Sequence, residues 1–168
     1  MKNKLLFVII LIFICITASS CSARVYAPCR EILGALVDAE VGLPAGKIYD
    51  MKAPAGDGEF LSDSLLGALY GNGGLPPVAE SWLDCALFLS FSEHPCEFAV
   101  FLCDSRDAAV DTARILCSRL DSIKTLKGGG EYQALLDSAR VCIMKNYVVL
   151  IISSDADAAQ KTASRATG

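Results

Sequence analysis

Apolar residues recur on one face at helical spacing in two segments of the chain. In the first, residues 28–41, Pro28 suits a first helical position. The positions that share one face there are Ile32, Leu33, Leu36, Val37 and Val41. The longest helix is expected between Asp104, which can cap it, and the glycines at 128–130. The residues that fall on one line along it are Val110, Ala113, Cys117, Leu120 and Lys124, flanked by Leu116 and Ile123. Shorter helices are predicted over 59–70, 131–138 and 155–166.

Four apolar, strand-like runs lie between these helices, at 81–91, 96–103, 139–144 and 147–153. The turn-like residues 92–95 and the pair Lys145-Asn146 join them into two hairpins. Residues 47–58 are rich in Pro, Gly and Ala and are predicted to form a loop. The order of elements predicts a single α+β domain over 28–168. We expect a mostly antiparallel four-stranded sheet that carries helices on one face, with its other face open.

The first twenty residues have the layout of an export signal. Two lysines precede the apolar run 5–16, and small residues then lead to Cys21. The run would rise only about 18 Å as a helix, which is short for a bilayer core of about 30 Å. Ala18-Ser19-Ser20-Cys21 resembles a bacterial lipobox, although Thr17 stands where leucine is usual. We therefore predict cleavage between Ser20 and Cys21 and diacylation of the Cys21 thiol. The alternatives are a secretory signal cut near Ala23 or Ala27, or an uncleaved helix.

A lipid-anchored protein follows from this prediction. Residues 21–27 would form a tether, and acyl chains on Cys21 would keep the domain on the outer, extracytoplasmic face of the cell membrane. Cleavage of the signal removes two lysines and no acidic residues. The mature chain would therefore have 13 basic and 19 acidic side chains and a net charge of −6. Anionic headgroups should repel such a body, so the lipid does the anchoring. The same acidity argues against a nucleic-acid partner.

Six cysteines remain in the mature domain: Cys29, Cys85, Cys96, Cys103, Cys117 and Cys142. No C-x-x-C pair exists and His94 is the single histidine, so no zinc site of recognised spacing is available. Lys127-Gly128-Gly129-Gly130 lacks the order of a phosphate-binding loop. We therefore expect neither a metal nor a cofactor. Export makes disulfides chemically possible, but a chain of this size can bury a core without them. Free buried thiols are slightly favoured, and at least one disulfide is the alternative.

Glu97 is the first candidate for a functional residue. By strand alternation it shares a face with Ala99 and Phe101. A carboxylate on a covered face needs a partner, which Arg106, Arg114 or Arg119 could supply. Structural pairing or simple exposure is the ordinary explanation. A ligand-binding role, or general acid–base catalysis, is the alternative.

Other candidate residues carry weaker signals. His94 lies two residues from Cys96, which is compatible with a Cys-His nucleophile, but a solvated loop histidine is the favoured interpretation. Tyr70 and Tyr147 are expected to be core or edge aromatics whose hydroxyls reach water or backbone, with a recognition surface as the alternative. Asn146 suits a turn because asparagine tolerates left-handed backbone.

Several of these residues, in this order, resemble an uncharacterised family of Gram-positive lipoproteins known as domain of unknown function 4358. The resemblance rests on the lipobox ending in Cys21, Leu69-Tyr70-Gly71, Glu97-Phe98-Ala99-Val100-Phe101, Asp104, Arg119, Tyr132 and Asn146-Tyr147-Val148. It covers nearly the whole mature chain. Leu102 and Cys103 depart from it, since polar or basic residues are usual there, and Lys145 stands where glycine is common. The resemblance implies an exported, lipid-anchored domain and no established activity.

The sequence thus favours a non-catalytic interaction or accessory module that contacts a protein partner through its open sheet face or an edge strand. Its candidate interaction or ligand residues are Glu97, Arg119, Tyr70, Asn146 and Tyr147. One alternative is a small hydrolase or thiol enzyme that uses Glu97, or Cys96 with His94. Another is a ligand-binding accessory lipoprotein of a transporter, against which the size argues.

Overall fold

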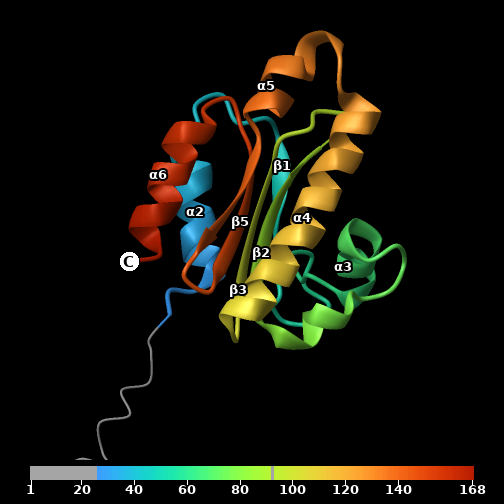
Figure 1. Ribbon diagram of the computed structural model, residues 1–168, viewed down its shortest axis with the longest axis vertical. Helices are drawn as coiled ribbons and strands as arrows, with labels where there is room; N and C mark the ends of the chain where they lie inside the picture. Colours follow the sequence, from blue (N-terminus) through green and yellow to red (C-terminus); the bar gives the residue numbers. More distant parts are fainter. Residues whose placement is uncertain (1–25, 92) are drawn as a thin grey trace, which may run out of the picture.

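The computed structural model describes residues 26–91 and 93–168, which build one five-stranded antiparallel sheet with helices on both faces (Figure 1). The strand order is β1-β2-β3-β5-β4. The strands are β1 (Gly46–Asp50), β2 (Trp82–Ser90), β3 (Glu97–Cys103), β4 (Arg140–Met144) and β5 (Tyr147–Ile152). The helices are α2 (Cys29–Ala39), α3 (Asp63–Tyr70), α4 (Arg106–Lys127), α5 (Gln133–Ser138) and α6 (Ala156–Ala166). Short 3₁₀ turns lie at η1 (Pro77–Ser81) and η2 (Gly130–Tyr132). The predicted α+β class is therefore confirmed.

The two predicted hairpins are present. β2 pairs with β3, with Phe88 opposite Phe98, and β4 pairs with β5, with Val141 opposite Leu150. β3 and β5 join the hairpins at the centre of the sheet. Every residue of these two central strands is buried. The centre of the sheet is thus the most protected part of the fold.

A fifth strand corrects the expected count of four. β1 forms inside the segment that was predicted to be a loop, because its apolar residues pair with β2: Ile48 lies opposite Phe88 and Tyr49 opposite Leu87. The proline and glycine of that segment begin only at Pro54. The loop prediction therefore holds for the second half of the segment and fails for the first.

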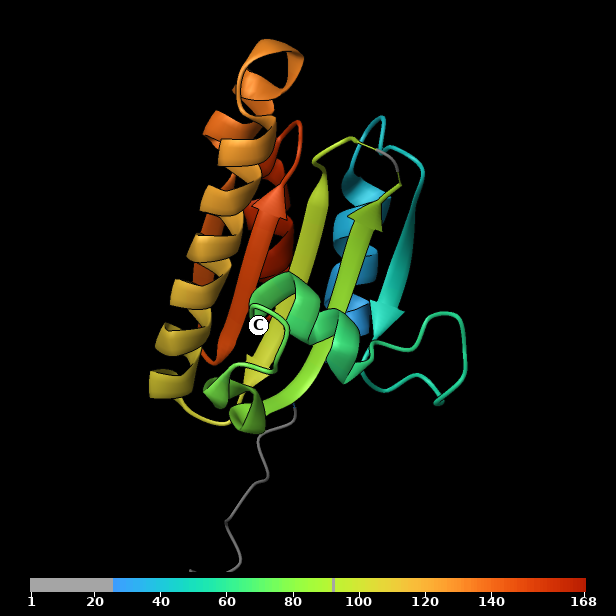
Figure 2. The same ribbon diagram turned by 90° about the vertical axis from the view of Figure 1, so that its right-hand side faces the viewer.

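The expectation of helices on one face is also wrong. One core lies between the sheet and α3, α4 and α5, and it includes Ala99 and Phe101 of β3. The other lies between the sheet and α2 and α6, and it includes Phe98 and Val100 of the same strand. Figures 1 and 2 show α4 and α3 on one side of the sheet and α2 and α6 on the other. Because both faces are covered, the sheet has no open face that could serve as a contact surface.

Some helix details differ from the sequence prediction. α4 is capped by Ser105, whose hydroxyl accepts from the amide of Ala108, instead of by Asp104. Its buried face includes Thr112, while Cys117 is exposed. The indole nitrogen of Trp82 donates to the hydroxyl of Thr112 at 2.8 Å, so this buried side chain has a hydrogen-bond partner. A threonine can be buried when its hydroxyl has a hydrogen-bond partner. The pattern of apolar residues in the sequence does not reveal such a partner.

The remaining boundaries shift by a few residues. α2 ends at Ala39, so Val41 lies beyond it and is 90% exposed. α3 begins at Asp63, after a cap by Ser62, four residues later than expected. In the β4–β5 turn the left-handed residue is Lys145, with φ of 57°, and not Asn146.

Candidate functional site

The carboxylate of Glu97 lies at the start of β3 and points toward α4. The residue is only 3% exposed. Arg119 of α4 donates from Nη2 to Oε2 of Glu97 at 2.8 Å. Tyr70, the last residue of α3, donates from its hydroxyl to Oε1 at 3.1 Å. Each oxygen of the carboxylate therefore has a partner from a different helix.

This arrangement agrees with the expected pairing of Glu97 and corrects the expectation for the Tyr70 hydroxyl. Of the three arginines considered for Glu97, Arg119 is the partner, and its side chain is 24% exposed. Tyr70 was expected to reach water or backbone, but its hydroxyl reaches the carboxylate instead. Its ring packs edge-on against Phe101 with centroids 5.4 Å apart. Tyr70 and Arg119 therefore tie α3 and α4 to the same strand position.

Burial and charge fix the protonation of the two donors. Burial raises the pKa of Tyr70 well above its usual value, and the neighbouring Glu97 raises it further. Burial alone would lower the pKa of Arg119, but the charge of Glu97 outweighs it and the pKa is raised. Tyr70 thus stays neutral as a hydrogen-bond donor and Arg119 stays cationic.

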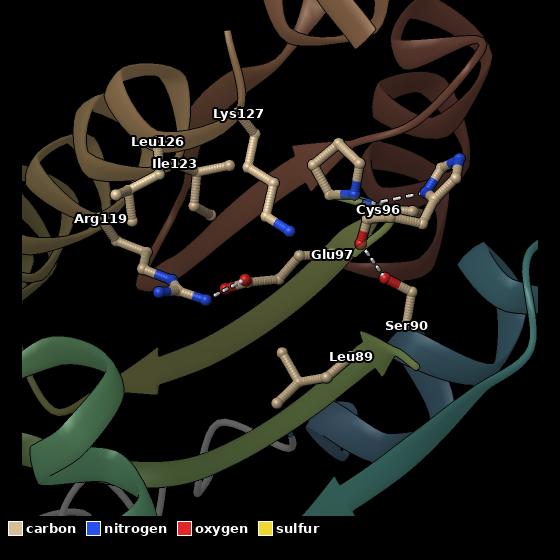
Figure 3. A pocket seen from close by; sticks show the side chains of 10 residues that line it. Leu89, Ser90, Cys96, Glu97, Arg119, Ile123, Leu126 and Lys127 are labelled. Carbon is tan, nitrogen blue, oxygen red and sulfur yellow. Dashed lines mark hydrogen bonds and ion pairs between the residues drawn. The ribbon is translucent and has the colours of Figure 1, made fainter. Parts of the chain in front are cut away.

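A hollow of about 230 Å³ opens beside this pair, between the β2–β3 turn and the C-terminal half of α4 (Figure 3). Glu97 and Arg119 form one wall. Leu89, Ile123 and Leu126 contribute apolar surface. The volume suits a small group of a few heavy atoms, because pockets for drug-sized ligands run from about 300 to 1,000 Å³.

Lys127, the last residue of α4, adds a second cation to the hollow. Its ammonium group extends toward the same space as the Glu97–Arg119 pair (Figure 3). Nζ donates to the backbone carbonyl of Glu93 at 2.8 Å. Among residues 26–91 and 93–168, no carboxylate forms an ion pair with it. With Glu97 and Arg119 compensating each other, the hollow carries a net positive charge.

A second, polar hollow of about 360 Å³ lies on the other side of Arg119. Tyr70, Asn72, Ser118 and Ser122 are among its lining residues. Arg119 therefore separates two hollows. Its Nε atom is buried without a hydrogen-bond partner in the described part of the chain, so the guanidinium keeps donor capacity that Glu97 does not use.

The Cys-His pair does not have the geometry of a nucleophile. Nδ1 of His94 accepts a hydrogen bond from the backbone amide of Cys96 at 3.1 Å, so this nitrogen is occupied. The Cys96 residue is 3% exposed. Burial, followed by the charges of Glu40 and Glu97, raises the pKa of the thiol to about 12. A thiol in this state is a poor nucleophile. His94 is half-buried, with its ring edge-on to Tyr132 at 5.1 Å.

The other two candidates, Asn146 and Tyr147, lie away from the hollow. Tyr147 belongs to the core under α2 and α6, and its hydroxyl donates to the carbonyl of Ala27 at 2.7 Å. Nδ2 of Asn146 donates to the backbone carbonyl of Asp104 at 3.3 Å and contacts the hydroxyl of Tyr26 at 3.4 Å. The five predicted residues therefore divide into two groups. Cys21 and Ser20 lie outside the described residues.

Six cysteines of the described residues are free thiols, and free thiols were slightly favoured over a disulfide. Cys29, Cys85, Cys96 and Cys103 are buried, and Cys117 is exposed. No cluster of three or more potential metal ligands occurs within the described residues.

A buried carboxylate that the sequence prediction missed lies on β2. Asp84 is 1% exposed. Its Oδ2 accepts from the backbone amide of Cys29 at 2.8 Å and lies 3.1 Å from Nζ of Lys52. The available signal was an acidic residue inside the otherwise apolar run 81–91. Asp84 lies outside the hollow and fixes the start of α2.

In the part of the chain that the structure describes, no helix combines the length and apolar character needed to cross a bilayer. Comparison with models of protein families, with curated proteins and with solved structures finds no match to this chain. The resemblance to domain of unknown function 4358 therefore stays a prediction.

Proposed function

We propose that this protein is a non-catalytic, lipid-anchored module at the extracytoplasmic face of the cell membrane, and that it binds an anionic group in the hollow beside Glu97. The observation that carries the proposal is the position of Lys127 and Arg119 around one small hollow. The Glu97 carboxylate is already paired with Arg119 and Tyr70. Within the hollow, Lys127 has no carboxylate partner among residues 26–91 and 93–168, and an anion would balance its charge.

The size and composition of the hollow narrow the ligand chemistry. A volume of about 230 Å³ accommodates a carboxylate or phosphate group with a short apolar extension. The apolar extension would lie against Leu89, Ile123 and Leu126. Charge-assisted hydrogen bonds from lysine and arginine are the usual means of holding such groups in proteins.

The geometry gives less support to an enzyme. The Cys96 thiol is buried with a raised pKa, and Nδ1 of His94 is occupied by a backbone amide. Both oxygens of Glu97 accept hydrogen bonds, so a proton transfer would first have to break one of them. A binding function requires none of these changes.

Titration of the protein with sodium acetate and with inorganic phosphate, followed by ¹H–¹⁵N NMR, tests the binding function. We expect saturable shifts of the amides of Cys96 and Lys127 with at least one of these anions. Sodium chloride at matched ionic strength should not reproduce them. Lys127→Ala should weaken binding about tenfold, the loss of one charge-assisted hydrogen bond. Lys161→Ala removes an exposed lysine from α6, on the opposite face, and serves as the matched control. Absence of saturable shifts with both anions would contradict the proposal.

A Cys21→Ser substitution tests the anchor separately. Because only the thiol takes the lipid, the variant should leave the membrane fraction or remain unprocessed. Metabolic labelling with a fatty-acid analogue should label the wild-type chain alone. Unchanged processing and membrane fractionation of the variant would refute lipid anchoring.

A further inference from the structure

The described chain enters the domain through a small cluster of polar and aromatic contacts, here termed the entry clamp and consisting of Tyr26, Ala27, Asn146 and Tyr147. The rings of Tyr26 and Tyr147 lie edge to face with centroids 6.0 Å apart. The Tyr147 hydroxyl donates to the carbonyl of Ala27 at 2.7 Å. The entry clamp therefore fixes residues 26–27 against the β4–β5 turn.

A second contact fixes the chain two residues later. The backbone amide of Cys29 donates to Asp84 at 2.8 Å, and Asp84 is itself paired with Lys52. Because Asp84 is buried, breaking this contact would leave a buried carboxylate with fewer partners. The entry point is therefore a fixed part of the domain.

The hollow lies at the opposite end of the sheet. α4 begins next to Asp104, which Asn146 of the entry clamp contacts, and ends at Lys127 in the wall of the hollow. Its 22 residues span about 33 Å. Figures 1 and 2 show the chain entering at one end of the molecule, with the β2–β3 turn and the C-terminal end of α4 at the other. The entry clamp and the hollow are thus separated by nearly the length of the domain.

We infer that the entry clamp orients the domain with its hollow away from the bilayer, and that the hollow binds an acidic group of another extracytoplasmic protein. The inference rests on the proposed function and names the partner of that same site. Five residue steps join Cys21 to Tyr26, which reach at most about 18 Å. This is shorter than α4, and a net charge of −6 on the mature chain disfavours a position flat on anionic lipid.

The rim of the hollow supports a protein partner over a lipid headgroup. Leu126 lines the hollow and is 80% exposed. An exposed apolar side chain beside a cationic hollow fits a peptide segment in which an acidic residue has an apolar neighbour. A headgroup could reach this end only if the domain tipped over or its entry clamp opened.

Paramagnetic NMR on the mature lipidated protein tests the orientation. The ¹⁵N-labelled protein is purified from membranes and placed in phosphatidylcholine nanodiscs that contain a gadolinium-chelating lipid. We expect the amides of Asn146 and Tyr147 to broaden strongly and those of Glu93 and Lys127 to broaden least. Equal broadening at both ends, or the reverse order, would overturn the orientation whatever the hollow binds.

Two substitutions test the role of the entry clamp. Tyr147→Phe keeps the ring but removes the hydrogen bond to Ala27, so the difference in broadening between the two ends should shrink. Tyr49→Phe on β1 is the matched control and should leave the wild-type difference intact. An undiminished difference in Tyr147→Phe would show that the clamp does not set the orientation. The broadening of the wild-type amides at the two ends of the domain still tests the orientation if a variant folds poorly.

The partner class is tested with two short peptides in the same nanodiscs. Acetyl-Leu-Asp-Leu-amide should shift the Lys127 amide, and acetyl-Leu-Asn-Leu-amide should bind about tenfold more weakly, because it lacks the charge. Shifts of the Lys127 amide on replacing phosphatidylcholine by phosphatidylglycerol, without peptide, would overturn the protein partner in favour of a headgroup. Binding of acetate or phosphate but of neither peptide would overturn the partner and leave the proposed function intact.

Discussion

Arg119 of α4 donates to Glu97 of β3 at 2.8 Å, and this bond joins the first residue of a central strand to the helix that covers it. The carboxylate is buried and the arginine is partly buried. The pair therefore contributes to the packing of α4 as well as to the hollow. Mutations at either position are expected to change stability and, through the proposed function, anion binding.

A double-mutant cycle on Glu97→Gln and Arg119→Gln measures how much the two groups stabilise each other. We expect each single variant to lose about 2–4 kcal/mol of unfolding free energy, because it leaves one partner poorly compensated. The double variant should lose less than the sum, since neither charge remains. Urea denaturation measures all four proteins. Strict additivity would show that the two groups do not stabilise each other.

Two glycines give opposite expectations for alanine substitution. A methyl group at Gly46 would lie 2.4 Å from Cζ of Phe88 and 2.6 Å from the carbonyl oxygen of Leu89. We expect Gly46→Ala to lower the unfolding free energy by about 1–3 kcal/mol through overpacking. Gly34 lies inside α2 with nothing within 4 Å of the added carbon. Gly34→Ala should raise stability by about 0.5–1 kcal/mol, because alanine favours the helix. Urea denaturation measures the unfolding free energy of both variants. Equal changes in Gly46→Ala and Gly34→Ala would contradict the different surroundings of the two glycines.

The thiols should differ in reactivity according to burial. Cys117 is exposed, whereas Cys29, Cys85 and Cys96 are at most 3% exposed. Under native conditions iodoacetamide should label Cys117 first, and the three buried thiols should react only on unfolding. Mass spectrometry of peptides after timed labelling gives the order. Rapid labelling of Cys96 in the folded protein would argue against the burial seen here.

Stability should fall at alkaline pH. Burial raises the pKa of Cys96 from 9.0 to about 12 and that of Tyr147 from 10.0 to about 12. Between these values the unfolded chain releases protons that the folded chain keeps, so unfolding is favoured as pH rises. The full stabilisation is present below pH 9 and is lost progressively toward pH 12. Urea midpoints at pH 8, 9 and 10 should decrease, and Cys96→Ala should reduce the slope. A constant midpoint would be inconsistent with these pKa shifts.

The strands of the two hairpins could be predicted because their apolar runs and turn residues are local features of the sequence. The arrangement of the helices was predicted wrongly, because the apolar run of β3 was not taken as evidence that both faces of the sheet are covered. Glu97 to Cys103 reads as a nearly continuous apolar run, and such a run is typical of a strand covered on both faces. Strand alternation across Phe98 and Ala99 placed apolar groups on both sides, which already argued against an open face.

The only part of the site that the sequence predicted was the pairing of Glu97 with an arginine. A buried carboxylate on β3 required a cation, and α4 offered Arg106, Arg114 and Arg119, of which only the fold identifies Arg119 as the partner. The contribution of Lys127 depends on where α4 ends relative to the β2–β3 turn, which is a tertiary feature. Asp84 and the amide of Cys29 are 55 positions apart, so no local pattern connects them. Asn146 and Tyr147 were grouped with the site, but the fold places them at the entry point of the chain.

The burial of four thiols has a consequence for biogenesis. A nascent chain that folds outside the membrane meets an oxidising solvent while all its sulfhydryls are still accessible. Formation of the two cores buries four thiols, those of Cys29, Cys85, Cys96 and Cys103, and so removes them from contact with that solvent. If the chain is exported as we propose, folding competes with disulfide formation, and the rate at which the two cores form determines how much protein avoids non-native disulfides.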